Sequence, residues 1–172
     1  VLGLLALSSG ATDEAAAQLS EAARVLAAMG IVHPGAIPVL PDAIEACARA
    51  GEVDTARALL ERYERQVGTV DTAWGRASLE RSRGILLLAV GDAEAATTSL
   101  ETARTELERL GHRPEAARAA LAHGQALLRA GRRTRAADAF AWACELFSQA
   151  GAVLWELRAA EELERAAPGR AE

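Results

Sequence analysis

Apolar side chains recur along this sequence at fixed distances from four glycines, which are spaced 41, 40 and 40 residues apart. These glycines are Gly10, Gly51, Gly91 and Gly131. An alanine follows each of them by five residues, a leucine or phenylalanine by nine, and an alanine or tyrosine by twelve. In three copies another glycine lies seven residues upstream, as Gly3, Gly84 and Gly124. The chain is therefore built from repeats of about 40 residues.

The repeat and the composition together predict an all-α fold. Alanine makes up about a quarter of the chain and aromatic residues only 3%, which suits closely packed helices and suits strands badly. Prolines between Ile31 and Pro41 delay the start of the third helix. The expected helices cover residues 1–9, 12–29, 39–50, 52–67, 71–90, 92–110, 114–130, 132–150 and 152–166.

The small residues of each repeat have a packing role. A glycine and an alanine leave no bulk where the two helices of a hairpin cross, and the large residue nine positions on fills the space toward the next hairpin. Gly91 and Asp92 are expected to end one helix and to cap the next. A period of 40 residues, longer than the roughly 34 of a tetratricopeptide repeat, implies longer helices or looser connections.

With these residue types at these offsets, the chain resembles tetratricopeptide repeats over nearly its full length. The resemblance implies a right-handed solenoid of antiparallel helix pairs over residues 1–167, stabilised by the stacking of neighbouring hairpins. Residues 168–172, which include Pro168 and Gly169, are expected to begin a linker.

The charge balance argues against a nucleic-acid or membrane protein. The formal net charge is -5, every base is an arginine, and no stripe of arginines is dense enough for phosphate binding. The longest apolar run is too short to span a bilayer, and the residues from Val1 to Leu7 lack the basic segment of a signal peptide. We therefore expect a cytoplasmic chain that is a segment of a longer protein.

No motif for catalysis or metal binding is present in the sequence. Cys47 and Cys144 lie far apart and are expected to be free thiols rather than a disulfide. His123 is interpreted as a partly buried helix residue rather than a ligand or a base, because no acidic or cysteine partner has a suitable spacing. We expect neither a cofactor nor enzymatic activity.

The first helix of each pair lines the concave groove in tetratricopeptide arrays. Mapped onto this repeat, that face includes Glu45, Arg49, Arg81, Arg118, Gln125 and Arg129. The groove is thus basic within an acidic chain, and we hypothesise that its arginines bind an acidic or phosphorylated ligand or a partner segment. Trp74 is a further candidate for partner contact, although core packing is the commoner role of a tryptophan on a helix.

Residues His123 to Arg165 resemble a narrower family. The matching residues, in order, are Gly124, Leu128, Arg129, Gly131, Arg132, Arg133, Ala136, Phe147, Gly151, Ala152, Trp155, Arg158, Ala159, Glu162, Leu163 and Arg165. This segment is similar to the last repeat of large, ATP-binding LuxR-type transcriptional regulators of actinobacteria, just ahead of their helix-turn-helix domain. The resemblance implies a signal-sensing and protein-interaction module, with DNA reached only through a C-terminal domain that this chain lacks.

Two other interpretations stay open. A free-standing tetratricopeptide adaptor would bind partner proteins without any link to transcription. An enzyme built on helices is the third, although no catalytic constellation supports it. Fold alone does not decide between them.

Overall fold

The computed structural model describes residues 1–31, 33, 35 and 37–167, and in this part of the chain all regular structure is helical. The linker predicted at residues 168–172 lies outside the described residues. The helices are α1 (Leu2–Ser9), α2 (Thr12–Ala28), α3 (Val39–Arg49), α4 (Val53–Thr69), α5 (Ala73–Ala89), α6 (Ala93–Arg109), α7 (Arg113–Arg129), α8 (Arg133–Gln149) and α9 (Val153–Ala166). The all-α prediction is confirmed, and α3 begins late, at Val39, as the prolines indicated.

Helix length explains the long repeat. From α4 to α8 every helix has 17 residues, and from α5 to α9 consecutive helices are joined by turns of three residues. One helix and one turn thus make a unit of about 20 residues, and two units make the repeat. The 40-residue period is therefore explained by longer helices and not by looser connections.

The turns depend on glycines in the left-handed conformation. Gly91 has a φ of 91° and Gly131 a φ of 76°, values that other residues rarely adopt. The Asp92 N–H then donates to the Leu87 carbonyl at 3.0 Å, and the Asp92 carboxylate accepts from the Ala95 N–H at 3.1 Å. The predicted glycine stop and aspartate cap are both confirmed here.

Glycines also allow the paired helices to approach closely. A Cβ atom at Gly84 in α5 would lie 2.5 Å from Cγ of Leu100 in α6, and one at Gly124 in α7 would overlap the ring of Phe140 in α8. In the three copies that have the upstream glycine, the large residue therefore packs on the glycine of its own hairpin, whereas the sequence pattern placed it toward the next hairpin.

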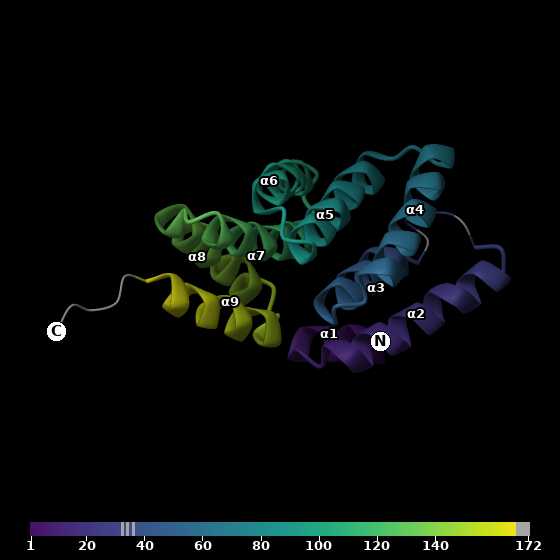
Figure 1. The fold of residues 1–172 in the computed structure, drawn as a ribbon, viewed down its shortest axis with the longest axis horizontal. Coiled ribbons are helices and arrows are strands. Elements are labelled where there is room, and N and C mark those ends of the chain that lie inside the picture. The colour runs from purple at the N-terminus through teal and green to yellow at the C-terminus, as the bar shows by residue number, and fades with distance from the viewer. Residues whose placement is uncertain (32, 34, 36, 168–172) are drawn as a thin grey trace.

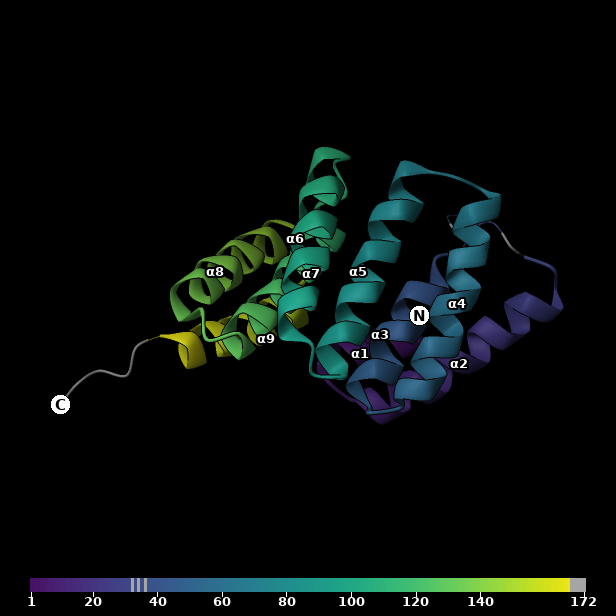
Figure 2. The same ribbon diagram turned by 45° about the horizontal axis from the view of Figure 1, so that its top comes forward.

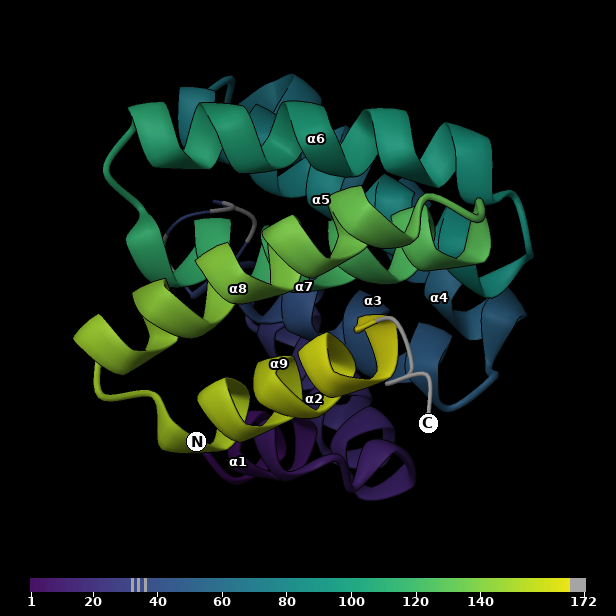
Figure 3. The ribbon, with the colours of Figure 1, turned by 90° about the vertical axis from the view of Figure 1, so that its left-hand side faces the viewer.

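The array curves until its two ends meet. Odd-numbered helices contact one another (α1 with α3, α3 with α5, α5 with α7, α7 with α9) and so line the inner side of the curve. Helix α9 lies beside α1, as Figures 1 and 3 show, and Arg158 in α9 donates to the Leu7 carbonyl in α1 at 2.6 Å. In Figure 2, α3, α4 and α5 run side by side, while α8 and α9 lie on the other side of α6 and α7. Among the described helices, none has the length and apolarity to cross a membrane.

Candidate ligand-binding site

A cluster of four charged side chains lies on the inner side of the curve. Arg81 in α5 donates to Glu45 in α3 at 2.6 Å, and its side chain is only 2% exposed. Arg118 in α7 donates to Asp42 at 2.7 Å and to Glu45 at 2.6 Å. We call Asp42, Glu45, Arg81 and Arg118 the charged layer. It joins α3 to α7, two helices that are not neighbours in the array.

An aromatic side chain lies against the charged layer. The Arg118 guanidinium lies 4.9 Å from the ring centre of Trp155 in α9, and that of Arg158 lies 4.8 Å from it. The Trp155 ring also stacks on Phe147, with the ring centres 6.0 Å apart. Cation–π contacts of partly buried arginines stabilise such an arrangement. Helix α9 is thus connected to the charged layer through its tryptophan.

The arginines hold Glu45 ionised. Burial by itself raises the pKa of the Glu45 carboxyl, but the surrounding arginines more than offset this and hold it well below its ordinary value. Burial lowers the pKa of Arg81, and the positive charge of Arg118 lowers it further. Burial also opposes the charge of Arg118, yet Glu45 and Asp42 raise its pKa overall. Glu45, Arg81 and Arg118 are therefore charged at neutral pH.

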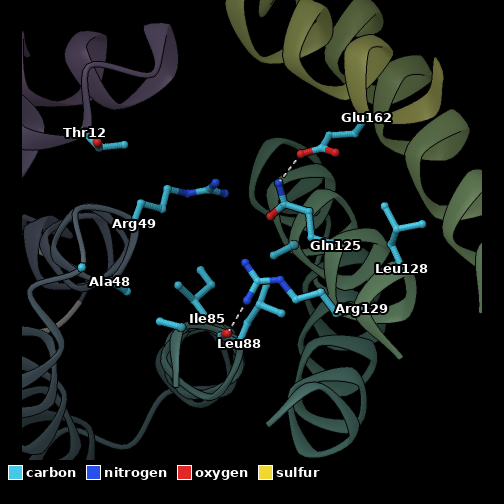
Figure 4. A pocket seen from close by; sticks show the side chains of 12 residues that line it. Thr12, Ala48, Arg49, Ile85, Leu88, Gln125, Leu128, Arg129 and Glu162 are labelled. Carbon is cyan, nitrogen blue, oxygen red and sulfur yellow. Dashed lines mark hydrogen bonds between the residues drawn. The ribbon is translucent and has the colours of Figure 1, made fainter. Parts of the chain in front are cut away.

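A cavity of about 420 Å³ lies beside the charged layer, toward the C-terminal ends of the odd-numbered helices (Figure 4). Arg49 of α3 points into it from one side, and Gln125 and Arg129 of α7 lie on the other side. Glu162 of α9 completes the polar part of the wall. The apolar part comes mainly from α5 and α7, with Ile85, Leu88, Ala89, Ala122 and Leu128.

Arg49, Arg129 and Gln125 are each oriented by one hydrogen bond. The Arg49 Nε donates to Glu45 at 2.9 Å, and the Arg129 Nη1 donates to the Leu88 carbonyl at 2.7 Å. The Gln125 amide donates to Glu162 at 2.8 Å. A smaller cavity of about 230 Å³ adjoins the first, because both are lined by Arg49, Gln125 and Glu162. The smaller one is also lined by Arg158 and Arg165.

The structure divides the predicted groove residues into two groups. Glu45, Arg81 and Arg118 belong to the charged layer, so the arginine side chains already bind carboxylates of the chain itself. Arg49, Gln125 and Arg129 line the cavity. These six residues come together on the inner side of the curve.

Trp74, the remaining candidate, lies elsewhere. It is half-buried at the start of α5, and its ring centre is 6.3 Å from that of His112. It packs against a separate small cluster of buried residues that includes Leu107 and Ala116. The structure therefore does not bring Trp74 to the cavity.

Asp42, Arg158 and Glu162 belong to this interior but were not among the predicted groove residues. The repeat register indicates two of these residues, Arg158 and Glu162. Arg158 follows Arg118 by one repeat of 40 residues, and Glu162 occupies the same place in α9 as Ala122 does in α7. Extending the register into α9 would have added both residues to the groove.

His123 faces away from this interior. It is 5% exposed, its Nε2 has no partner within the described residues, and burial is the main reason that its pKa is lowered to about 4. It is therefore neutral at physiological pH, as a buried helix residue would be. Cys47 and Cys144 are both free thiols. No group of metal-binding side chains occurs among the described residues.

Comparison of the sequence with protein-family models and with curated proteins found no match.

Proposed function

We propose that this chain is a non-enzymatic sensing module of a larger LuxR-type transcriptional regulator, and that its signal is a small ligand bound in the cavity of the inner surface. The ligand would be held between α3, α5, α7 and α9. The module would change the regulator's state by stabilising one arrangement of these helices over another.

The cavity supports this proposal most directly. Its volume of about 420 Å³ is typical of small-molecule sites, and so is its combination of an apolar wall with a few convergent polar groups. Arg49, Gln125 and Glu162 come from three different helices. A ligand that contacts all three would bind the curved array more tightly than an opened one, which is the requirement for a population shift.

The link to a transcriptional regulator depends on α9. This helix contributes Glu162 to the cavity and carries much of the segment that resembles the last repeat before a helix-turn-helix domain. Ligand-dependent docking of α9 would then alter the position of a domain that follows it. DNA binding would belong to that domain and not to this chain.

A free-standing adaptor that binds partner proteins is the second candidate. Exposed apolar side chains on α1 and α9 favour it, among them Leu5, which is 54% exposed, and Leu157, which is 56% exposed. Such surface is a common mark of protein contact. The coding sequence beyond Glu172 separates the two candidates. A helix-turn-helix there supports the regulator, and a stop codon within a few residues supports the adaptor.

Ligand binding is tested by equilibrium dialysis of the 172-residue chain against a pooled extract of small molecules, read out by mass spectrometry. We expect at least one compound to be enriched by the native chain and not by Ala89→Trp, which fills the cavity from the end of α5. Ala58→Trp places the same side chain on an exposed face of α4 and is the matched control. If nothing is enriched, or if Ala89→Trp enriches the same compounds, the sensing function is rejected.

A further inference from the structure

The inner surface carries an excess of positive charge. Its arginines are Arg49, Arg81, Arg118, Arg129, Arg158 and Arg165, and its carboxylates are Asp42, Glu45, Glu161 and Glu162. Six cations therefore face four anions, within a chain whose net charge is -5. Two more cations than anions therefore line a concave, partly enclosed surface, and such a surface attracts an anion.

The excess is located at the cavity and not in the charged layer. In the charged layer, Arg118 donates to Asp42 and Glu45, and Arg81 donates to Glu45 and lies 3.8 Å from Asp42. At the cavity, Arg49 and Arg129 each donate one hydrogen bond, and within the described residues their remaining guanidinium nitrogens have no protein acceptor. Figure 4 shows these two side chains on opposite walls of the same cavity.

Arg158 extends the same pattern into the adjoining cavity. One of its terminal nitrogens donates to the Leu7 carbonyl, and no carboxylate pairs with it within the described residues. Burial lowers the pKa of Arg158, and the positive charges of Arg49 and Arg118 lower it further. An anion beside Arg49 would reduce this repulsion.

The remaining wall selects for an apolar body on the anion. Ile85, Leu88 and Ala89 of α5 and Ala122 of α7 face the cavity with no polar side chain among them. A bare inorganic anion would leave this wall in contact with water. A molecule with an apolar part would bury it, and this burial favours binding.

We infer that the cavity binds a small organic anion, with its charged group between Arg49 and Arg129 and its apolar body against α5 and α7. This inference rests on the proposed sensing function and names the class of its ligand. A small molecule fits better than an acidic peptide, because the salt bridges of Arg118 to Asp42 and Glu45 cross the inner surface and obstruct an extended chain.

The test is calorimetric titration of the 172-residue chain with matched pairs of an acid and its neutral amide. The pairs are butyrate, octanoate, benzoate and phenylacetate, each against the corresponding amide, and octyl phosphate tests a phosphate in place of a carboxylate. We expect at least one anion to bind about tenfold or more tightly than its neutral counterpart, the effect of charge-assisted hydrogen bonds. Tighter binding of octyl phosphate than of octanoate would assign a phosphate headgroup.

Two variants locate the anion. Arg49→Gln and Arg129→Gln should each weaken the binding of the best anion about tenfold or more and leave the weak binding of its amide unchanged. Arg104→Gln, which removes an arginine that lies over Trp142 outside the cavity, is the matched control and should have no effect. Circular dichroism verifies that each variant is folded.

The inference is overturned if no anion of the panel binds better than its amide, or if Arg49→Gln and Arg129→Gln bind as the native chain does. The dialysis experiment separates this failure from failure of the sensing function. Neutral compounds enriched by the native chain and lost in Ala89→Trp would leave a sensor for a neutral ligand. The absence of any such compound would remove the sensor as well.

Discussion

The inner surface has two regions built from the same residue type, and they differ in what surrounds the arginines. In the charged layer, Arg81 and Arg118 are buried and bind Asp42 and Glu45. At the cavity, Arg49 and Arg129 keep most of their donors facing open space. Arginine on a concave face is therefore structural where the chain supplies the anion and is available for a ligand where it does not.

This difference predicts that losing a charge lowers stability much more in the charged layer than at the cavity. In the charged layer, removing one partner leaves the others buried and unpaired, which is the expensive way to break a salt bridge. At the cavity, Arg129 is exposed, and Glu45 keeps two other arginines when Arg49 is lost, so a lost charge alters binding far more than stability.

The largest effect is expected for Glu45→Gln. Glu45 accepts from Arg49, Arg81 and Arg118, and the substitution removes the charge that compensates all three. We expect the free energy of unfolding to fall by about 3–5 kcal/mol at neutral pH, measured by urea titration. Glu108→Gln, at an exposed end of α6, is the control and should cost less than about 1 kcal/mol. Equal costs for the two variants would contradict the distinction between the regions.

Lowering the pH should reduce the free energy of unfolding in two stages. His123 has a folded-state pKa of about 4 against an ordinary value of 6.5, so the unfolded chain binds its proton first. The stability that depends on neutral His123 is present above pH 6.5 and is lost as the pH falls toward 4, by roughly 2–3 kcal/mol.

The charged layer responds at lower pH. The pKa of Glu45 is held below its ordinary 4.5, so the stability that Glu45 contributes is present above 4.5 and is lost as the pH falls below it. In urea titrations across this range, His123→Leu should remove the first stage and leave the second. If the first stage persists in this variant, another group is responsible for it.

A smaller effect concerns the hairpin that supports both regions. Replacing glycine by alanine within a helix usually stabilises it by roughly 0.5–1 kcal/mol. At Gly124 the sign should reverse, because the new methyl group would overlap Phe140, and we expect a loss of about 1–2 kcal/mol. Gly68→Ala is the matched comparison, since no atom outside its own helix lies within 4 Å of that Cβ position. Thermal melts of both variants should shift in opposite directions.

The smallest change in stability is expected for Arg49→Gln. The variant loses an i,i+4 salt bridge at the edge of the charged layer, but Glu45 keeps Arg81 and Arg118 as partners, so the free energy of unfolding should change by less than about 1 kcal/mol. The same urea titration measures it. A loss as large as that of Glu45→Gln would mean that Arg49 is structural and would remove the basis for assigning it to a ligand.

The helices were predictable because their signals are local. A left-handed glycine at the end of a helix, such as Gly91, and a cap such as Asp92 are each read within a few residues. The common face of Arg81, Arg118 and Arg129 followed from the repeat register. The shared position of these residues on one surface therefore came from the sequence, although their different environments did not.

The pairing within the charged layer was not predictable in the same way. Arg118 and Asp42 are 76 residues apart, and their contact depends on how tightly the array curves. Curvature results from the packing of every hairpin on the next, to which many small contacts contribute. Sequence pattern indicates which residues face inward and does not indicate how far apart they lie.

The contact of α9 with α1 has a consequence for folding. Most contacts in a helical-repeat array join neighbours, so the terminal helices of such arrays fray independently. Here the Arg158 hydrogen bond to Leu7 spans 151 residues of the chain and joins α9 to α1. Each of these helices covers the other, so amide hydrogen exchange should detect them opening as one unit. The same contact raises the contact order, and the array should fold more slowly than an open one of equal length.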